Sequence, residues 1–405
     1  MSAPRHIDDK HYYIYNQYGD NPMQPVGPIG IIAHNQASDL SDAINFFLRN
    51  RRSEYLSRHS ELATNPGFMR YDYRISVSTP RFSSGEGKAM ISQSVRGHDL
   101  FIITDVLNYA STYERFSQTV TMGPDDHYQD LLRIILAVSG KARRINVILP
   151  YLYEGRQYRR TNRESLDCAA ALRHLFDLGI DNLITFDAHD GRIVNSVPTR
   201  GMENISTTYQ IIESLLKTIP DLRLDRDHAM VVSPDETAIS RSVYFSSMLG
   251  VPLGIFYRKR DYQRMVDGNH PVVGQQFLGD DVRGRDVLVI DDMIVTGASM
   301  LRVAYDLKAR GASRVFCAVS FAQFTSGLST MNQAYAEGVI DRIFATNLIY
   351  RSPELLNAPW FVEVNMSRFM ALLIDAINHD TSLSRLMTPT DKIQKLVSFY
   401  KSRHR

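Results

Sequence analysis

The feature that most constrains the fold of this sequence is a regular alternation of short β-prone runs with amphipathic runs of helix length. In the N-terminal half, the strand-like runs are 29–33, 100–104, 145–149 and 182–186. Between them, apolar residues recur at spacings of three and four, at 41–48, 127–138 and 165–178. Such alternation is typical of parallel sheets covered by helices, because each parallel connection needs a crossover. The sequence therefore predicts an α/β fold.

The same alternation recurs in the C-terminal half, with strand-like runs at 229–232, 253–257, 286–290 and 314–319 and helix-like runs at 238–249 and 298–309. We expect two α/β domains of similar design, each a mostly parallel sheet flanked by helices. The predicted divisions are an N-terminal extension (1–26), a first domain (27–203), a second domain (204–375) and a helical tail (376–405). Segments near 50–80 and 106–126 lack a clear period and are interpreted as insertions in the first domain.

The composition excludes several classes of protein. Of the 405 residues, 44% are hydrophobic and 22% are charged, which is an ordinary globular mixture. The net charge of +2 gives no sign of a nucleic-acid or membrane partner. The two cysteines, Cys168 and Cys317, lie too far apart in sequence to indicate a disulfide framework or a zinc site. No run of about 18 apolar residues and no signal segment is present, so we expect a cytoplasmic protein.

The segment 287–299 carries the clearest chemistry, and it reads Val-Leu-Val-Ile-Asp-Asp-Met-Ile-Val-Thr-Gly-Ala-Ser. A buried strand would end at two carboxylates, and a short turn would then open a helix. The free amides at a helix N-terminus attract an anion, and glycine lets the backbone approach a phosphate closely. The carboxylates suit ribose hydroxyls. We interpret the segment as a cradle for ribose 5-phosphate, formed by Asp291, Asp292, Thr296, Gly297, Ala298 and Ser299.

The alternative interpretation of this segment is a capped helix with an Asp pair on the surface. The Asp pair and the Thr-x-x-Ser spacing, taken without their surroundings, would favour that alternative. The full order of strand, Asp-Asp, three residues, Thr-Gly-x-Ser and helix favours the phosphate cradle.

This segment resembles the phosphoribosyl-pyrophosphate binding motif of type I phosphoribosyltransferases and ribose-phosphate pyrophosphokinases. Further segments distinguish the two families, because they resemble parts of the pyrophosphokinases in the right order over roughly 27–375. They are the Pro-Tyr-x-x-Tyr-x-Arg-Gln stretch at 150–157 (with Tyr153 one place early), the Asp-x-His segment at 187–189, the Ser-Pro-Asp turn at 233–235, the mobile basic loop at 258–260, and two early segments at 81–86 and 94–99. The chain is thus identified as similar to a ribose-phosphate pyrophosphokinase of a longer, bacterial-looking kind.

The resemblance implies an Mg²⁺-dependent enzyme that binds ATP and ribose 5-phosphate and feeds nucleotide biosynthesis. The diphosphoryl group of ATP would pass to the anomeric hydroxyl of the sugar, and AMP would leave. The resemblance also implies a homo-oligomer, a hexamer in the family, in which part of the adenine site is lent to a neighbouring subunit. The implied roles are ATP binding for Arg156 and Gln157, adenine binding across the interface for Phe82, Ser84 and Glu86, Mg²⁺ binding for His189 and Asp235, and catalysis for Arg258 and Arg260.

Three positions depart from the family pattern. Thr237 replaces a small glycine, Ser240 replaces the lysine of a Lys-Arg pair, and Arg258 replaces the lysine of the mobile loop. These departures leave open a catalytically weak or regulatory subunit, and a type I phosphoribosyltransferase is a further alternative. The sequence contains no Gly-x₄-Gly-Lys-Ser/Thr loop, which argues against an ordinary P-loop kinase.

Overall fold

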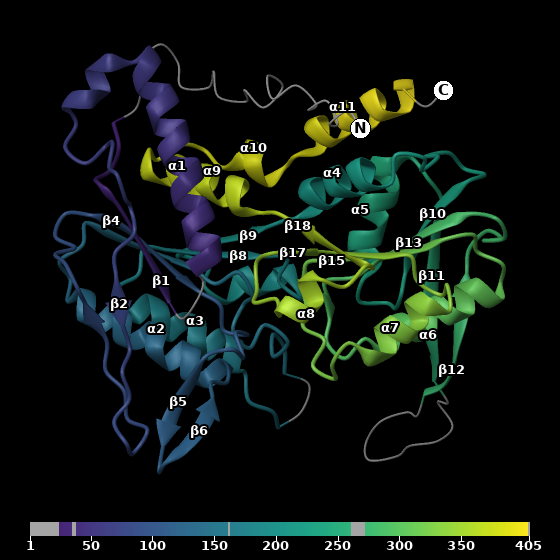
Figure 1. The fold of residues 1–405 in the computed structure, drawn as a ribbon, viewed down its shortest axis with the longest axis horizontal. Helices are drawn as coiled ribbons and strands as arrows, with labels where there is room; N and C mark the ends of the chain where they lie inside the picture. The colour runs from purple at the N-terminus through teal and green to yellow at the C-terminus, as the bar shows by residue number, and fades with distance from the viewer. Residues whose placement is uncertain (1–23, 35–37, 161–162, 261–271, 404–405) are drawn as a thin grey trace.

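The computed structural model describes residues 24–34, 38–160, 163–260 and 272–403, without the side chains at 38, 258–260 and 272–275. The predicted N-terminal extension (1–26) lies almost wholly outside the described residues. Each half of the molecule contains a parallel sheet with helices on both of its faces (Figure 1). The predicted α/β fold with two mostly parallel sheets is therefore confirmed. No helix in the described ranges has the length and apolar character needed to cross a membrane.

The first sheet has five strands, all parallel, in the order β1-β4-β7-β8-β9. Each of the strand-like runs predicted for the N-terminal half forms one of its strands. The fifth strand lies in a stretch that Pro and Gly had marked as a break, and the predicted boundary after 203 falls inside it. The strands are β1 (Ile29–His34), β4 (Asp99–Thr104), β7 (Arg144–Ile148), β8 (Asn182–Phe186) and β9 (Gly201–Ile205).

Helices from both ends of the chain cover the first sheet. On one face lie α2 (Pro124–Val138) and α3 (Asp167–Asp177), and on the other lie α1 (Ser38–Arg58) and α9 (Ser367–Asn378) (Figure 1). Apolar side chains of α1 and α9 form one core with those of the sheet. A helix near the end of the chain thus completes the core of the first half.

The second sheet has seven strands in the order β12-β11-β10-β13-β15-β17-β18, and only the edge strand β12 is antiparallel to its neighbour. One face packs against α4 (Thr208–Thr218), α5 (Ile239–Leu249) and α11 (Thr390–Arg403), and the other packs against α6 (Ala298–Ala309) and α7 (Ser329–Ala336). The strands are β10 (Ala229–Ser233), β11 (Leu253–Arg260), β12 (Val272–Leu278), β13 (Asp286–Ile290), β15 (Val315–Val319), β17 (Arg342–Thr346) and β18 (Phe361–Val364).

The two segments interpreted as insertions contain ordered structure. The helix expected at 41–48 extends to Arg58 and takes in the start of the first segment, which continues in a 3₁₀ turn, η2 (Ser60–Thr64). The second segment holds an antiparallel hairpin that projects from the first half of the molecule (Figure 1). Its strands are β5 (Thr112–Arg115) and β6 (Gln118–Thr121).

The remaining elements are short. They are β2 (Val77–Ser78), β3 (Met90–Ile91), β14 (Met293–Ile294), β16 (Phe321–Ala322), η3 (Gly191–Ser196), α8 (Pro353–Leu356) and α10 (Ser384–Met387).

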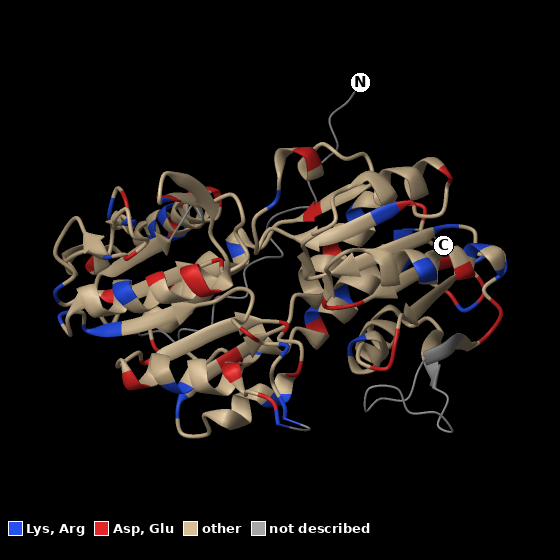
Figure 2. Ribbon diagram, turned by 90° about the horizontal axis from the view of Figure 1, so that it is seen from below, with Lys and Arg blue, Asp and Glu red and all other residues tan. Residues whose placement is uncertain are grey.

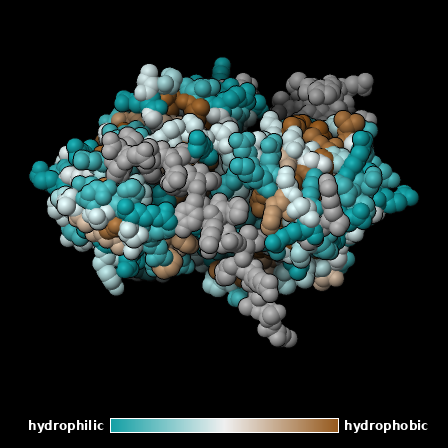
Figure 3. Space-filling view, turned by 90° about the horizontal axis from the view of Figure 1, so that it is seen from above, coloured by the Kyte–Doolittle hydropathy of each residue, from teal (hydrophilic) through white to brown (hydrophobic). Residues whose placement is uncertain are grey.

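Charged and hydrophobic residues are spread over both halves of the molecule (Figure 2 and Figure 3). Seen from below, basic and acidic residues are interspersed over both halves (Figure 2). Seen from above, the described surface is mostly hydrophilic, with hydrophobic side chains in separate patches (Figure 3). Cys168 and Cys317 are buried as free thiols.

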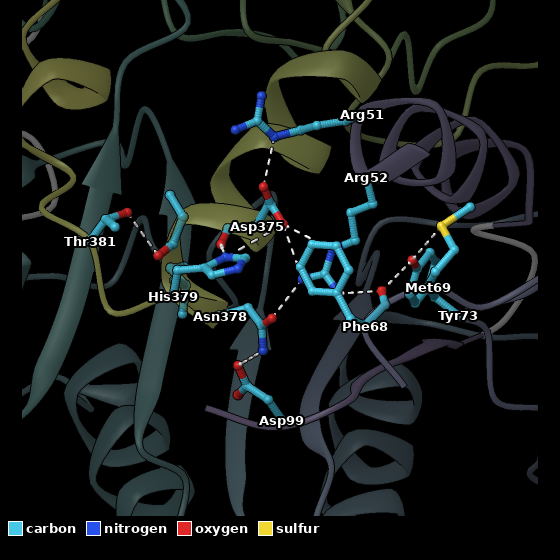
Figure 4. A network of polar contacts seen from close by, with 12 residues as sticks. Arg51, Arg52, Phe68, Met69, Tyr73, Asp99, Asp375, Asn378, His379 and Thr381 are labelled. Atoms are coloured by element: carbon cyan, nitrogen blue, oxygen red, sulfur yellow. Dashed lines mark hydrogen bonds and ion pairs between the residues drawn. The ribbon is translucent and has the colours of Figure 1, made fainter. Parts of the chain in front are cut away.

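A buried ionic network joins α1 to α9 (Figure 4). The Nε atoms of Arg51 and Arg52 donate to the two carboxylate oxygens of Asp375, at 2.7 and 3.0 Å. Arg52 also donates to the side chain of Asn378 at 2.6 Å, and Asn378 donates to Asp99 of β4 at 2.9 Å. Burial opposes the charge on Asp375, but Arg52 and Arg51 hold the pKa of this carboxyl far below its usual range. The network fixes α9 on the first sheet.

We expect Asp375→Asn to lower the free energy of unfolding by about 3–5 kcal/mol, because it leaves a buried arginine charge without its counter-ion. Chemical denaturation measures the change. The matched control is Asp380→Asn, because Asp380 pairs with Arg144 through a carboxylate that is 60% exposed. The control substitution should lower the free energy of unfolding by no more than about 1 kcal/mol. Equal losses in the two variants would contradict the role of Asp375 as the counter-ion of the buried arginine.

Candidate active site

The carboxyl ends of strands from both sheets meet, and we use the name cleft for the region in which their polar side chains contact one another. Ligands of parallel α/β sheets bind at this edge, because the connecting loops there are free to carry polar side chains. From the first sheet, β8 leads into Asp187 and His189. From the second, β13 leads into Asp291 and Asp292, and β10 leads into Asp235.

One short contact joins the two sheets across this cleft. Nδ1 of His189 lies 2.7 Å from Oδ2 of Asp292. The pKa of His189 is raised, chiefly because the Asp292 carboxylate accepts its hydrogen bond, while burial opposes the shift. Two residues that the sequence assigned to different ligands, a metal and a sugar, are therefore neighbours.

A second set of contacts centres on the buried carboxylate of Asp187. Thr207 donates to its Oδ2 through the amide at 3.1 Å and through the hydroxyl at 2.6 Å. Ser320, which follows β15 of the second sheet, donates to the same oxygen at 2.5 Å. Arg241 on α5 forms an ion pair with Oδ1 at 2.8 Å. Asp187 thus links the end of β8 to two elements of the second half.

The pKa values of the adjacent carboxyl groups Asp291 and Asp292 are shifted in opposite directions. Burial and the charge of Asp292 raise the pKa of Asp291. Burial also acts against ionised Asp292, but the hydrogen bond to His189 and the charge of Arg241 lower its pKa. Two close carboxyl groups do not both ionise readily, because their negative charges repel each other. A bound cation, or hydroxyl groups that donate hydrogen bonds, would reduce that repulsion.

The segment predicted to bind a phosphate forms a turn that leads into α6. Gly297 precedes α6 with φ of 90°, a left-handed conformation that favours glycine. A Cβ at this position would collide with the side chain of Met331. Thr296, Ala298 and Ser299 are exposed at the N-terminal end of the helix. The turn therefore presents exposed hydroxyl groups beside the helix amides.

Arg156 and Asp235 lie within electrostatic reach of the cleft. The charge of Arg156 lowers the pKa of His189, and that of Asp235 raises it, although neither is the main cause of the shift. Asp235 also holds the turn before α5, because its Oδ1 accepts hydrogen bonds from the amide and hydroxyl of Thr237. Gln157 follows Arg156 in an exposed loop, and its amide donates to the carbonyl of Glu154 at 2.8 Å.

Phe82, Ser84 and Glu86 form the tip of a hairpin away from these contacts. Phe82 donates through its amide to the carbonyl of Glu86 at 2.8 Å, and its side chain is 56% exposed. Ser84 donates to the Glu86 carboxylate at 3.0 Å. The backbone of Phe116, at the tip of the β5–β6 hairpin, donates to Ser83 at 3.0 Å. The two hairpins therefore lie side by side.

The predicted catalytic cations Arg258 and Arg260 lie at the end of β11. Their backbone pairs with β12, with an irregular register between Lys259 and Arg260. Their side chains lie outside the described residues, so the catalytic roles remain predictions.

The donor set of the cleft suits a hard divalent cation in part. Carboxylate oxygens are the ligands that Mg²⁺ prefers, and Asp235 supplies them within electrostatic reach of His189. Among the described residues, no group of three or more His, Cys, Asp and Glu side chains is arranged to hold a metal ion on its own. This set fits an ion that takes its other ligands from water and from a bound phosphate.

Sequence reasoning did not identify the roles of Asp187, Thr207, Arg241 and Ser320. The local signals were weak: Asp187 and Ser320 are single polar residues directly after strands, a common arrangement. Asp187 has φ of 37°, a conformation that non-glycine residues rarely adopt, but the sequence does not reveal it.

Comparison with known proteins agrees with this arrangement. Residues 56–179 match the profile of the N-terminal domain of ribose phosphate pyrophosphokinase, and residues 201–335 match the phosphoribosyl transferase domain. The ribose-phosphate pyrophosphokinase of Haemophilus influenzae is 30% identical over 315 residues, which cover 76% of this chain and 90% of that protein. The Pasteurella multocida protein of the same name is 29% identical over 314 residues, with coverage of 76% and 90%.

The fold is also that of a solved structure, the phosphoribosylpyrophosphate synthetase from Mycobacterium smegmatis. The two structures align with a TM-score of 0.67 and 19% sequence identity, covering 87% of this chain and 99% of that one. On the sequence comparison and the matched domains together, the chain belongs to the ribose-phosphate pyrophosphokinase family.

Proposed function

We propose that this protein is a Mg²⁺-dependent ribose-phosphate diphosphokinase. It transfers the β,γ-diphosphoryl group of ATP to the anomeric hydroxyl of ribose 5-phosphate, giving 5-phosphoribosyl 1-diphosphate and AMP for nucleotide biosynthesis. The observation that carries the proposal is the 2.7 Å contact between His189 and Asp292. It joins the Asp-x-His segment of one sheet to the acidic pair and phosphate cradle of the other. A phosphoribosyltransferase alone has no need of the first sheet or of its Arg156–Gln157 loop.

Ribose 5-phosphate binds on the second sheet in this proposal. Its phosphate takes the amides and hydroxyls of Thr296–Ser299, where the helix dipole also favours an anion. Asp291 and Asp292 accept hydrogen bonds from the sugar hydroxyls. These contacts orient the anomeric hydroxyl toward the first sheet.

ATP binds across the cleft, with its phosphates on Arg156 and Gln157. A guanidinium group suits phosphate oxygens because it donates two parallel hydrogen bonds. His189 and Asp235 would hold Mg²⁺, which, when bound, neutralises phosphate charge. Phosphoryl transfer depends on positioning and charge stabilisation more than on covalent help from the protein. The cations at Arg258 and Arg260 supply further charge and exclude water from the cleft.

Assembly completes the adenine site in this proposal. Phe82, Ser84 and Glu86 are exposed on a hairpin tip, and their hydrogen bonds are local. A neighbouring copy of the chain would therefore receive them, which makes the active form a homo-oligomer, and family resemblance suggests a hexamer.

The first test is the identity of the products. Incubation with ATP, Mg²⁺ and ribose 5-phosphate should yield AMP and 5-phosphoribosyl 1-diphosphate, because attack on the β-phosphorus expels AMP. Chromatography and phosphorus NMR separate the products. Omission of the sugar phosphate is the control and should abolish AMP release. Formation of ADP with a ribose bisphosphate would overturn the proposal, and an inactive wild type would favour a regulatory subunit, as the substitutions at Thr237, Ser240 and Arg258 allow.

A second test separates the two substrates. Asp292→Asn should weaken binding of ribose 5-phosphate about 10- to 150-fold, as expected for loss of a charge-assisted hydrogen bond worth ~1.5–3 kcal/mol. Binding of a non-hydrolysable ATP analogue should change far less, and calorimetry measures both. The exposed carboxylate of Asp281 gives a matched control, Asp281→Asn, which should alter neither affinity. Equal losses for both substrates would contradict the assignment of Asp292.

A third test concerns the basic segment 258–260. Arg258→Ala should lower kcat at least ~10²-fold, the usual effect of losing a group that stabilises charge in the transition state. Lys259→Ala is the matched control and should be nearly neutral. Steady-state kinetics at saturating substrates compares them. The reverse ranking would show that the alignment of this segment is displaced by one residue.

A further inference from the structure

Two exposed phenylalanines occupy neighbouring hairpin tips in the first half of the molecule. Phe82, which is 56% exposed, belongs to the tip that is proposed to complete the adenine site of another copy. Phe116, which is 76% exposed, lies at the tip of the β5–β6 hairpin, in the segment 106–126 that the sequence marked as an insertion. The backbone amide of Phe116 donates to the carbonyl of Ser83 at 3.0 Å, so the two tips are in direct contact.

One face of the β5–β6 hairpin rests on the hairpin at 81–87. Side chains alternate between the two faces of a strand, so Tyr113 and Arg115 share one face of β5. The guanidinium carbon of Arg81 lies 5.2 Å from the centre of the Tyr113 ring. Arg115 packs so closely against Gly85 that a Cβ at that glycine would lie 2.8 Å from the Cδ of Arg115. The two hairpins therefore form one unit, and a partner that receives one tip meets the other as well.

The turn of the β5–β6 hairpin gives no local reason for a phenylalanine. Arg115 pairs with Gln118, so the loop between the strands has two residues, Phe116 and Ser117. Their φ angles are 49° and 58°, in the left-handed region that asparagine and glycine adopt more easily in such turns. The side chain of Phe116 is thus both strained in its backbone and exposed to water. An outlier of this kind points to a function for the side chain.

We propose that the inserted hairpin is part of the surface between two copies of this chain, and that Phe116 packs on the ATP-binding loop of the neighbouring copy. The inference rests on the proposed function, in which the adenine site is shared between copies. In that arrangement, Phe82 of one copy reaches the ATP that Arg156 and Gln157 of another copy hold. Phe116 reaches the same neighbour, because its backbone is bound to Ser83.

The loop that receives Phe116 has suitable chemistry. Beside its ATP-binding residues it carries the half-buried Tyr158 and two exposed arginines, Arg159 and Arg160. The guanidinium carbon of Arg159 lies 5.5 Å from the centre of the Tyr158 ring. Tyrosine rings and guanidinium groups both pack well on a phenylalanine ring, and both are enriched at protein interfaces. Phe116 therefore adds an apolar anchor beside the shared adenine site.

Photocrosslinking of the full-length protein tests this contact without relying on activity. The photoreactive residue p-benzoylphenylalanine replaces Phe116, and in separate proteins it replaces Phe82 or Phe399, which is 44% exposed on α11. Irradiation should give covalent dimers from position 116, visible on a denaturing gel, and mass spectrometry should locate the link within 151–165 of the second copy. Position 399 is the control and should give no link to that segment.

The other outcomes separate this inference from the proposed function. Dimers from position 82 without dimers from position 116 would overturn the inference and leave the proposed function intact. Dimers from neither position would contradict the shared adenine site as well. Dimers from position 116 that are linked outside 151–165 would overturn the placement of Phe116 on the ATP-binding loop.

A substitution measures what the ring contributes to assembly. Phe116→Asn removes the ring and introduces a residue that suits the left-handed turn, so the hairpin keeps its shape. The dissociation constant of the homo-oligomer, measured by sedimentation over a dilution series, should rise at least about fivefold, as expected for loss of an aromatic anchor. The control Phe399→Ala should change that constant by less than about twofold. An unchanged dissociation constant for Phe116→Asn would contradict the proposal.

Discussion

The buried carboxylate of Asp187 is the interaction on which the cleft depends. It ends β8 of the first sheet, accepts a hydrogen bond from Ser320 beyond β15 and pairs with Arg241 on α5. A buried carboxylate is tolerated only where hydrogen bonds and an opposite charge compensate for lost hydration. Asp187 therefore requires that the carboxyl edges of both sheets stay together. His189, two residues later, then meets Asp292.

The α1–α9 network imposes a second constraint, away from the cleft. Asp375 receives Arg51 and Arg52, so α9, which follows the last strand of the second sheet, is fixed on the first sheet. The chain thus passes between the halves three times, at β9–α4, at β18–α9 and between α9 and α11. Together with the Asp187 contacts, these crossings limit how far the halves can separate. A cleft built from both halves gains rigidity from this arrangement.

Much of the framework could be predicted from the sequence, because buried parallel strands read as continuous apolar runs. The runs at 229–232 and 286–290 are examples, and the acidic pair with its glycine turn lies between β13 and α6, as its sequence implied. The spacing of apolar residues along a helix does not show which sheet the helix covers. The position of α9 on the first sheet was therefore not predicted. β9 was missed because its sequence, Gly-Met-Glu-Asn-Ile, lacks an apolar run.

Contacts between residues that are distant in the sequence could not be predicted, for a different reason. Asp187 and Arg241 belong to elements whose approach depends on the packing of both sheets, and neither residue is unusual for its local position.

A double-mutant cycle between Asp187 and Arg241 tests the central claim most directly. The free energy of unfolding is measured for the wild type, Asp187→Asn, Arg241→Gln and the double variant. If the pair joins the two halves, each single variant is destabilised, and the double variant loses at least about 1 kcal/mol less than the sum of the single losses. Losses that add within about 0.3–0.5 kcal/mol would show that the two residues act independently, and would contradict the account.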